Sequence, residues 1–146
     1  KLFDYCGEEI TKNDIDKVVA KGVGIRIFEL TDGIMSHEAK RAMNVLTELR
    51  SSNESAFGVM YLIYANVKKI LKAKLTGSSD AKTVAAAIGG SPFIAKKYIE
   101  SAKGFSEGAL TKMVIRIPEI DYEIKQGKID EWTAMEQYVS EALYYA

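Results

Sequence analysis

The stretch "AFGVMYLIYANVKKILKAKLTG", residues 56–77, determines the fold. Its apolar side chains recur at intervals of three and four residues, the period that places them on one face of an α-helix. They are Val59, Met60, Ile63, Val67, Ile70 and Leu71. Gly77 is typical of a helix C-terminus. The stretch therefore predicts one helix of about twenty residues, whose apolar face other helices must cover.

Shorter segments with the same period lie on both sides of this helix. Helices are predicted over residues 27–34, 36–49, 83–88, 91–104, 106–127 and 130–143. Ser36, Ser91 and Ser106 stand where a capping side chain is expected, and Pro118 predicts a kink in the helix that contains it. The alternation typical of a strand appears only briefly, in Gly24–Phe28. The expected fold class is all-α, a helical bundle.

The first 23 residues are expected to form a separate helical unit. Thr11 is placed to cap a helix there. Gly22 and Gly24 then loosen the backbone, which predicts a junction between residues 1–23 and residues 25–146. Because the chain begins without methionine, we expect it to be a piece of a longer protein.

The composition is that of a soluble globular protein, with 47% hydrophobic and 27% charged residues among 146. No apolar run approaches the roughly 18 residues that span a bilayer. Cys6 is the only cysteine, so the chain has no disulfide of its own. These features predict a cytoplasmic protein.

The formal net charge of zero conceals an uneven distribution. Residues 55–104 contain 8 basic and 2 acidic residues, a net charge of +6, whereas residues 105–146 contain 4 and 8, a net charge of −4. Residues 1–54, with 8 and 10, carry −2. A basic middle between acidic ends favours binding to a polyanion or pairing with oppositely charged protein surfaces.

No set of residues in the sequence has the spacing of a catalytic or metal site. His37 is the only histidine, and we interpret it as an exposed side chain in a first helical turn. The stretch "GSSDAKT", residues 77–83, resembles a phosphate loop but lacks its second glycine and a preceding strand. Asp121 with Lys125 four residues later favours a structural ion pair over acid–base catalysis. We therefore predict no cofactor, no metal and no enzymatic activity.

Two basic segments are candidates for contact with DNA. Residues 84–99 match a helix-turn-helix at several positions, with Lys96 and Lys97 placed to reach phosphates, but no Arg, Asn or Gln is placed to read bases. Lys68, Lys69 and Lys72 share one side of the long helix. Either they form an ordinary solvated flank or they contact a nucleic-acid backbone.

Three stretches together resemble the C-terminal part of the bacterial DNA polymerase III delta subunit family, a component of the sliding-clamp loader. They are "IFELTDGI" (27–34), "AAAIGGSPFIAKKYIESAKGFSEGAL" (85–110) and "EIDYEIKQGKIDEW" (119–132). The sequence departs from the family at Gly33, where alanine is frequent, and at Lys68-Lys69, where an arginine is common. The resemblance covers nearly the whole chain.

The resemblance implies a helical collar domain over residues 25–146, preceded by the end of an AAA+-type lid over residues 1–23. Collar domains pack side by side in a ring, so the other loader subunits are the expected partners. Arg116, Glu119 and Glu123 are candidate interface residues. The corner at Lys125 and Lys128 is a candidate contact with primer-template DNA.

We therefore predict a non-catalytic structural piece of a clamp loader, a nucleotidyltransferase only by membership of the polymerase III holoenzyme. It is expected to have no small-molecule substrate and no membrane partner. The alternatives from other classes are an independent helix-turn-helix regulator, which would bind a duplex alone with sequence preference, and a helical adaptor, which would bind neither DNA nor loader subunits.

Overall fold

The computed structural model describes residues 23–52 and 54–146. This part of the chain forms seven helices and no strand, which confirms the all-α prediction. The helices are α3 (Val23–Met35), α4 (Ala39–Ser51), α5 (Ala56–Thr76), α6 (Ala81–Ile88), α7 (Pro92–Lys103), α8 (Glu107–Lys125) and α9 (Glu131–Tyr145).

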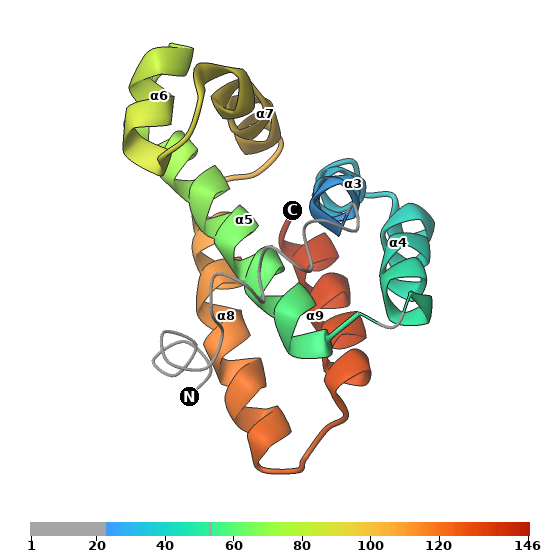
Figure 1. The fold of residues 1–146 in the computed structure, drawn as a ribbon. Coiled ribbons are helices and arrows are strands. Elements are labelled where there is room, and N and C mark those ends of the chain that lie inside the picture. The colour runs from blue at the N-terminus through green and yellow to red at the C-terminus, as the bar shows by residue number, and fades with distance from the viewer. Residues whose placement is uncertain (1–22, 53) are drawn as a thin grey trace.

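The long helix predicted from residues 56–77 is the centre of the bundle. As α5, it packs against α3, α6, α7, α8 and α9. Its fully buried side chains include Val59 and Ile70, both with no exposed surface. The C-terminal half of α5 lies against the α6–α7 pair, while α8, α9 and the α3–α4 pair lie along the rest of the bundle (Figure 1).

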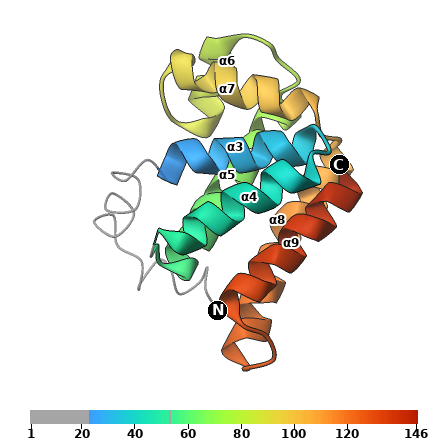
Figure 2. The same cartoon turned by 90° about the vertical axis from the view of Figure 1, so that its right-hand side faces the viewer.

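The α6–α7 pair and the turn between α8 and α9 lie at opposite ends of the molecule, as both views show (Figures 1 and 2). The α3 and α4 helices run side by side across one face (Figure 2). The two ends also differ in charge. The basic segment, residues 55–104, ends in α6 and α7, whereas the acidic segment, residues 105–146, contains α8 and α9.

Most helices begin where a polar side chain can cap them. The side chains of five N-cap residues accept hydrogen bonds from backbone N–H groups of the first turn, which otherwise lack partners inside the helix. These residues are Ser55, Asp80, Ser91, Ser106 and Asp130. The caps predicted at Ser91 and Ser106 are confirmed.

The cap predicted at Ser36 is wrong. The N–H of Ser36 still donates to the carbonyl of Asp32, so this residue belongs to the final turn of α3. His37 has φ 59° and turns the chain, and the N-cap of α4 is Glu38, without a side-chain cap. Consequently His37 is exposed as expected, but it lies in a turn rather than in the first turn of a helix.

One further expectation needs correction. Gly24 lies inside α3 rather than at a hinge, since that helix begins at Val23. In α9, Trp132 and Leu143 are half-buried and pack against the edge of the core, while Met135 and Val139 are buried. Pro118 lies inside helix α8, and the kink predicted there stays a prediction.

The predicted lid unit, residues 1–23, lies outside the described residues except for Val23. It stays a prediction, as does the domain boundary drawn at residue 25.

Two glycines allow close approach between helices. A Cβ atom at Gly33 would lie 3.1 Å from the backbone nitrogen of Ala42 in α4, so the absence of a side chain lets α3 and α4 pack closely. A Cβ at Gly104 would overlap the Met35 side chain at the end of α3. Gly33, which departs from the family pattern, is therefore explained by the close packing of α3 on α4.

Among the buried polar side chains, Asn66 and Thr31 link two helices, and Asp121 forms an ion pair within its own helix. The Asn66 amide of α5 donates to the Thr31 hydroxyl of α3 at 2.7 Å, and Thr31 donates to the Ile27 carbonyl. The predicted structural ion pair is present, with Lys125 Nζ 3.5 Å from Oδ2 of the fully buried Asp121.

Candidate functional site

A cluster of charges joins α8 to α9. The guanidinium of Arg116 donates to Glu141 of α9 at 2.7 and 3.3 Å, and to Glu123 of its own helix at 2.8 Å. Glu119 lies 3.4 Å away, one turn along α8. We call these four residues the Arg116 cluster. A planar guanidinium with five donors can serve several carboxylates at once, which a lysine could not do with the same geometry.

The Arg116 cluster changes the proton affinities of its members. The hydrogen bond with Glu141 is the main cause that raises the pKa of Arg116, against a smaller lowering by burial. Burial alone would raise the pKa of Glu141, but hydrogen bonds from Arg116 and Gln137 hold it below its ordinary value. Both groups therefore stay charged at neutral pH.

Three residues of this cluster are the ones predicted for a subunit interface. The structure brings Arg116, Glu119 and Glu123 together, but the Arg116 side chain is only 18% exposed and its main partners belong to this chain. Glu119 is the most exposed member, at 57%. The sequence pattern missed Glu141, which lies 25 residues from Arg116 and meets it only through the packing of α9 on α8.

Several lysines of the basic segment lie over aromatic rings. Lys68 Nζ is 4.9 Å from the ring centroid of Tyr64, and Lys69 Nζ is 5.8 Å from that of Tyr98. In α7, Lys97 Nζ is 5.3 Å from the Phe28 ring. These distances are those of cation–π contacts.

The rings of Phe28 and Tyr98 themselves meet at 5.2 Å, so an aromatic pair underlies Lys69 and Lys97 where α3, α5 and α7 join. Tyr98 is 6% exposed, and burial raises its pKa. An open groove of about 390 Å³ adjoins this pair, lined also by Tyr61 and Asn66.

The remaining lysines proposed for DNA contact are exposed at two separate places. Lys72 and Lys96 lie on α5 and α7, while Lys128 lies in the turn between α8 and α9, beside the paired Lys125. Because α7 and this turn are at opposite ends of the molecule, the candidate lysines form two groups and not one surface (Figures 1 and 2).

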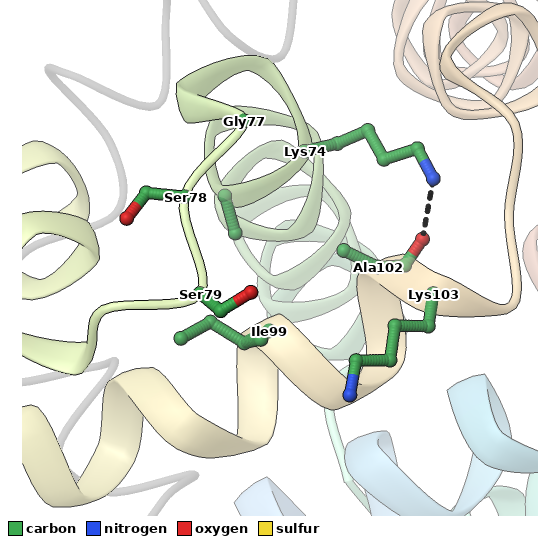
Figure 3. A pocket seen from close by; sticks show the side chains of 8 residues that line it. Lys74, Gly77, Ser78, Ser79, Ile99, Ala102 and Lys103 are labelled. Carbon is green, nitrogen blue, oxygen red and sulfur yellow. Dashed lines mark hydrogen bonds between the residues drawn. The ribbon is translucent and has the colours of Figure 1, made fainter.

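The loop that resembles a phosphate loop lines an open hollow of about 280 Å³ between α5 and α7 (Figure 3). Lys74 points across this hollow and donates to the Ala102 carbonyl at 3.2 Å, near the C-terminus of α7. Its charge therefore stabilises the end of a helix.

The N-terminus of α6, where a phosphate would be expected to bind, already holds a carboxylate. Asp80 accepts hydrogen bonds from the Thr83 hydroxyl and backbone N–H, which lower its pKa. The loop thus carries an anion of its own at the position that a nucleotide phosphate would need.

Within residues 23–52 and 54–146, no group of three or more His, Cys, Asp or Glu side chains is arranged to hold a metal ion. The same residues include no helix with the length and hydropathy to cross a bilayer.

Comparison with known protein families shows which family the chain belongs to. The sequence profile described as "DNA polymerase III delta subunit, C-terminal domain" matches residues 25–142. The chain belongs to this family. The resemblance found in the three sequence stretches is thereby confirmed.

Two relatives show how much of the delta protein the chain represents. The DNA polymerase III subunit delta of Bacillus subtilis (strain 168) is 29% identical over 147 residues, which cover 98% of this chain and 42% of that protein. The solved DNA clamp loader delta protein of Bacillus subtilis superposes with a TM-score of 0.76 and 27% identity, covering 84% of this chain and 37% of that one. The chain thus spans less than half the length of either relative.

Proposed function

We propose that this chain is the collar-like part of a clamp-loader delta subunit and that it works by holding other loader subunits in a ring. The observation that supports this most directly is the superposition on the delta protein of a DNA clamp loader at a TM-score of 0.76. An all-helical body with exposed apolar side chains on several helices suits a domain that packs against neighbours. The chemistry of the parent complex lies elsewhere, and this part contributes position.

The proposed partners are the other loader subunits and, through the assembled complex, primer-template DNA. Membership of the polymerase III holoenzyme, a nucleotidyltransferase, and a place in the cytoplasm follow from the same proposal. The independent regulator has no observation in its favour, since the matched family and both relatives are delta proteins.

Reconstitution tests the assembly role. The full delta chain, mixed with the other purified loader subunits, should yield a complex of defined stoichiometry by native mass spectrometry. A delta chain that ends before α3, and so lacks α3 to α9, should fail to enter this complex. Normal incorporation of the truncated chain would refute the proposal.

We further propose that Lys128, with Lys125 beside it, contacts the DNA backbone. Lys128 is exposed in a turn, and the pairing of Lys125 with the buried Asp121 fixes that side of the turn. The second group of candidates, Lys68, Lys69, Lys72, Lys96 and Lys97, lies on α5 and α7. Each lysine that neutralises one phosphate adds a little under one unit to the salt dependence of binding.

The two groups can be tested separately in the complete loader. Lys128→Ala should reduce the slope of log affinity against log salt by about one unit for primer-template DNA. Lys40→Ala, an exposed lysine on α4, is the matched control and should leave the slope unchanged. A Lys128→Ala complex with the slope of the unmodified complex would remove this residue from the proposal.

A further inference from the structure

The outer face of α8 carries an apolar stripe that no part of the described chain covers. Ile115 is 56% exposed and Tyr122 is 57% exposed. They are separated by about two helical turns, or about 10 Å along the axis, and point within about 20° of each other. Pro118, half-buried, and Glu119 lie between them on the same side.

This stripe is directed outward by the packing of the rest of α8. Met113, Ile117 and Ile120 are almost completely buried and point into the core. Tyr138 of α9 donates its hydroxyl to the Met113 carbonyl at 3.1 Å, which fixes the inner face of α8. The outer residues therefore cannot be drawn inward without unpacking the bundle.

The charge beside the stripe specifies the chemistry of a partner. The Arg116 cluster contains one arginine and three glutamates, so it carries a net charge of −2. Arg116 is occupied by Glu141 and Glu123, and it reaches Glu119 only at 3.4 Å. Glu119 thus has an exposed carboxylate within the apolar stripe and can accept a bond from a cation.

We propose that this stripe, Ile115, Pro118 and Tyr122 with Glu119, is the seat of a helix from a neighbouring loader subunit, and that this helix presents apolar side chains flanked by Lys or Arg. An amphipathic helix offers anchors at this spacing, and a basic residue would offset the −2 charge of the cluster. The inference rests on the proposed role in loader assembly. It assigns the interface to the apolar stripe, with Arg116 as the residue that holds the acidic cluster in place.

The first experiment removes the apolar anchors from the full delta chain. Ile115→Ala with Tyr122→Ala keeps good helix formers on an exposed surface, so the melting temperature should stay unchanged. Affinity for the other loader subunits should fall about thirtyfold, because apolar anchors at the centre of an interface dominate binding. The matched control is Leu75→Ala with Phe93→Ala, an exposed aliphatic and an exposed aromatic side chain on α5 and α7, which should bind as the unmodified chain does.

The second experiment tests the predicted charge of the partner. Glu119→Lys should weaken loader binding more than Glu119→Gln does. Glu136→Lys is the control, since Glu136 is similarly exposed, at 53%, and has one distant arginine partner. A partner helix with acidic flanks would give the opposite order and overturn the assignment.

Four outcomes separate the possibilities. If the unmodified chain joins the loader and the Ile115→Ala, Tyr122→Ala chain joins it equally well, the stripe is not the interface, while the proposed function stands. Equal loss in the control pair also overturns the assignment to α8. If the stripe variant abolishes only association between delta chains, the occupant is a second copy and the inference is wrong. If the unmodified chain does not join the loader, both proposals fail.

Discussion

The two ends of the bundle use charge in different ways. At the acidic end, formed by α8 and α9, carboxylates meet Arg116 in hydrogen-bond geometry and tie one helix to the other. At the basic end, formed by the C-terminal half of α5 with α6 and α7, lysines lie over rings such as Tyr98 and Phe28. At the acidic end a charged cluster links two helices, whereas at the basic end lysines contact aromatic rings.

The difference has a consequence for what each end can bind. A carboxylate that accepts two hydrogen bonds from a guanidinium has little capacity left for another cation. A ring attracts an ammonium group but does not cancel its charge, so the same lysine can also approach an anion. The charges of the Arg116 cluster therefore mainly tie α8 to α9, whereas the lysines over rings stay available to an anion.

The largest expected effect tests the apolar junction of the basic end. Tyr98→Ala should lower the free energy of unfolding by about 3 kcal/mol, because it removes a 6% exposed ring that α3, α5 and α7 share. Tyr98→Phe keeps the ring, so it should change the free energy of unfolding by less than about 0.5 kcal/mol. Urea titration followed by circular dichroism measures both. A small loss in Tyr98→Ala would mean that the lysines hold this end after all.

The next effect tests the charged tie of the acidic end. Arg116→Ala should lower the free energy of unfolding by about 2 kcal/mol, since it leaves two partly buried carboxylates, Glu123 and Glu141, without their shared donor. Arg41→Ala is the matched control, because Arg41 is 43% exposed and pairs with Glu38 at 3.5 Å. The control should change stability by less than about 0.5 kcal/mol in the same titration. Equal effects of the two substitutions would contradict the comparison.

A smaller effect appears as a dependence on pH. The pKa of Glu141 is held below its ordinary value of 4.5, so its contribution is present above that pH and disappears as the pH falls through the folded-state value. At pH 7, Glu141→Gln should lower the free energy of unfolding by about 1 kcal/mol. Near pH 3 that difference should shrink. Glu136→Gln, at an exposed site, is the control and should have the same free energy of unfolding as the unmodified protein at each pH. If the difference in free energy caused by Glu141→Gln did not change with pH, this explanation would be wrong.

Local chemistry explains which parts of the fold were predictable from sequence. The caps at Ser91 and Ser106 depend on contacts within three residues of the helix start, so the pattern was sufficient. Ser36 has the same hydroxyl side chain, but the cap predicted there was wrong, because its N–H still donates to a carbonyl of α3. Whether a residue ends one helix or begins the next depends on how closely the two helices pack. Here the absence of a side chain at Gly33 allows the close approach of α3 to α4.

The candidate site was predictable only along single helices. The spacing of Arg116, Glu119 and Glu123 on α8 shows one charged side, but the strongest partner, Glu141, comes from another helix. The aromatic rings beneath Lys69 and Lys97 were missed for the same reason. Phe28 and Tyr98 are far apart in sequence and meet only after α3 packs beside α7.

The smallest effect on stability isolates the charge of the basic end. Lys97→Met keeps an aliphatic stem over the Phe28 ring and removes the ammonium, so the free energy of unfolding should change by less than about 0.5 kcal/mol. If the basic end contacts a phosphate, the same variant should reduce the salt slope of DNA binding by the complete loader by about one unit. A large loss of stability would show that this lysine, like Arg116, holds helices together. An unchanged slope would remove Lys97 from the candidates for DNA contact.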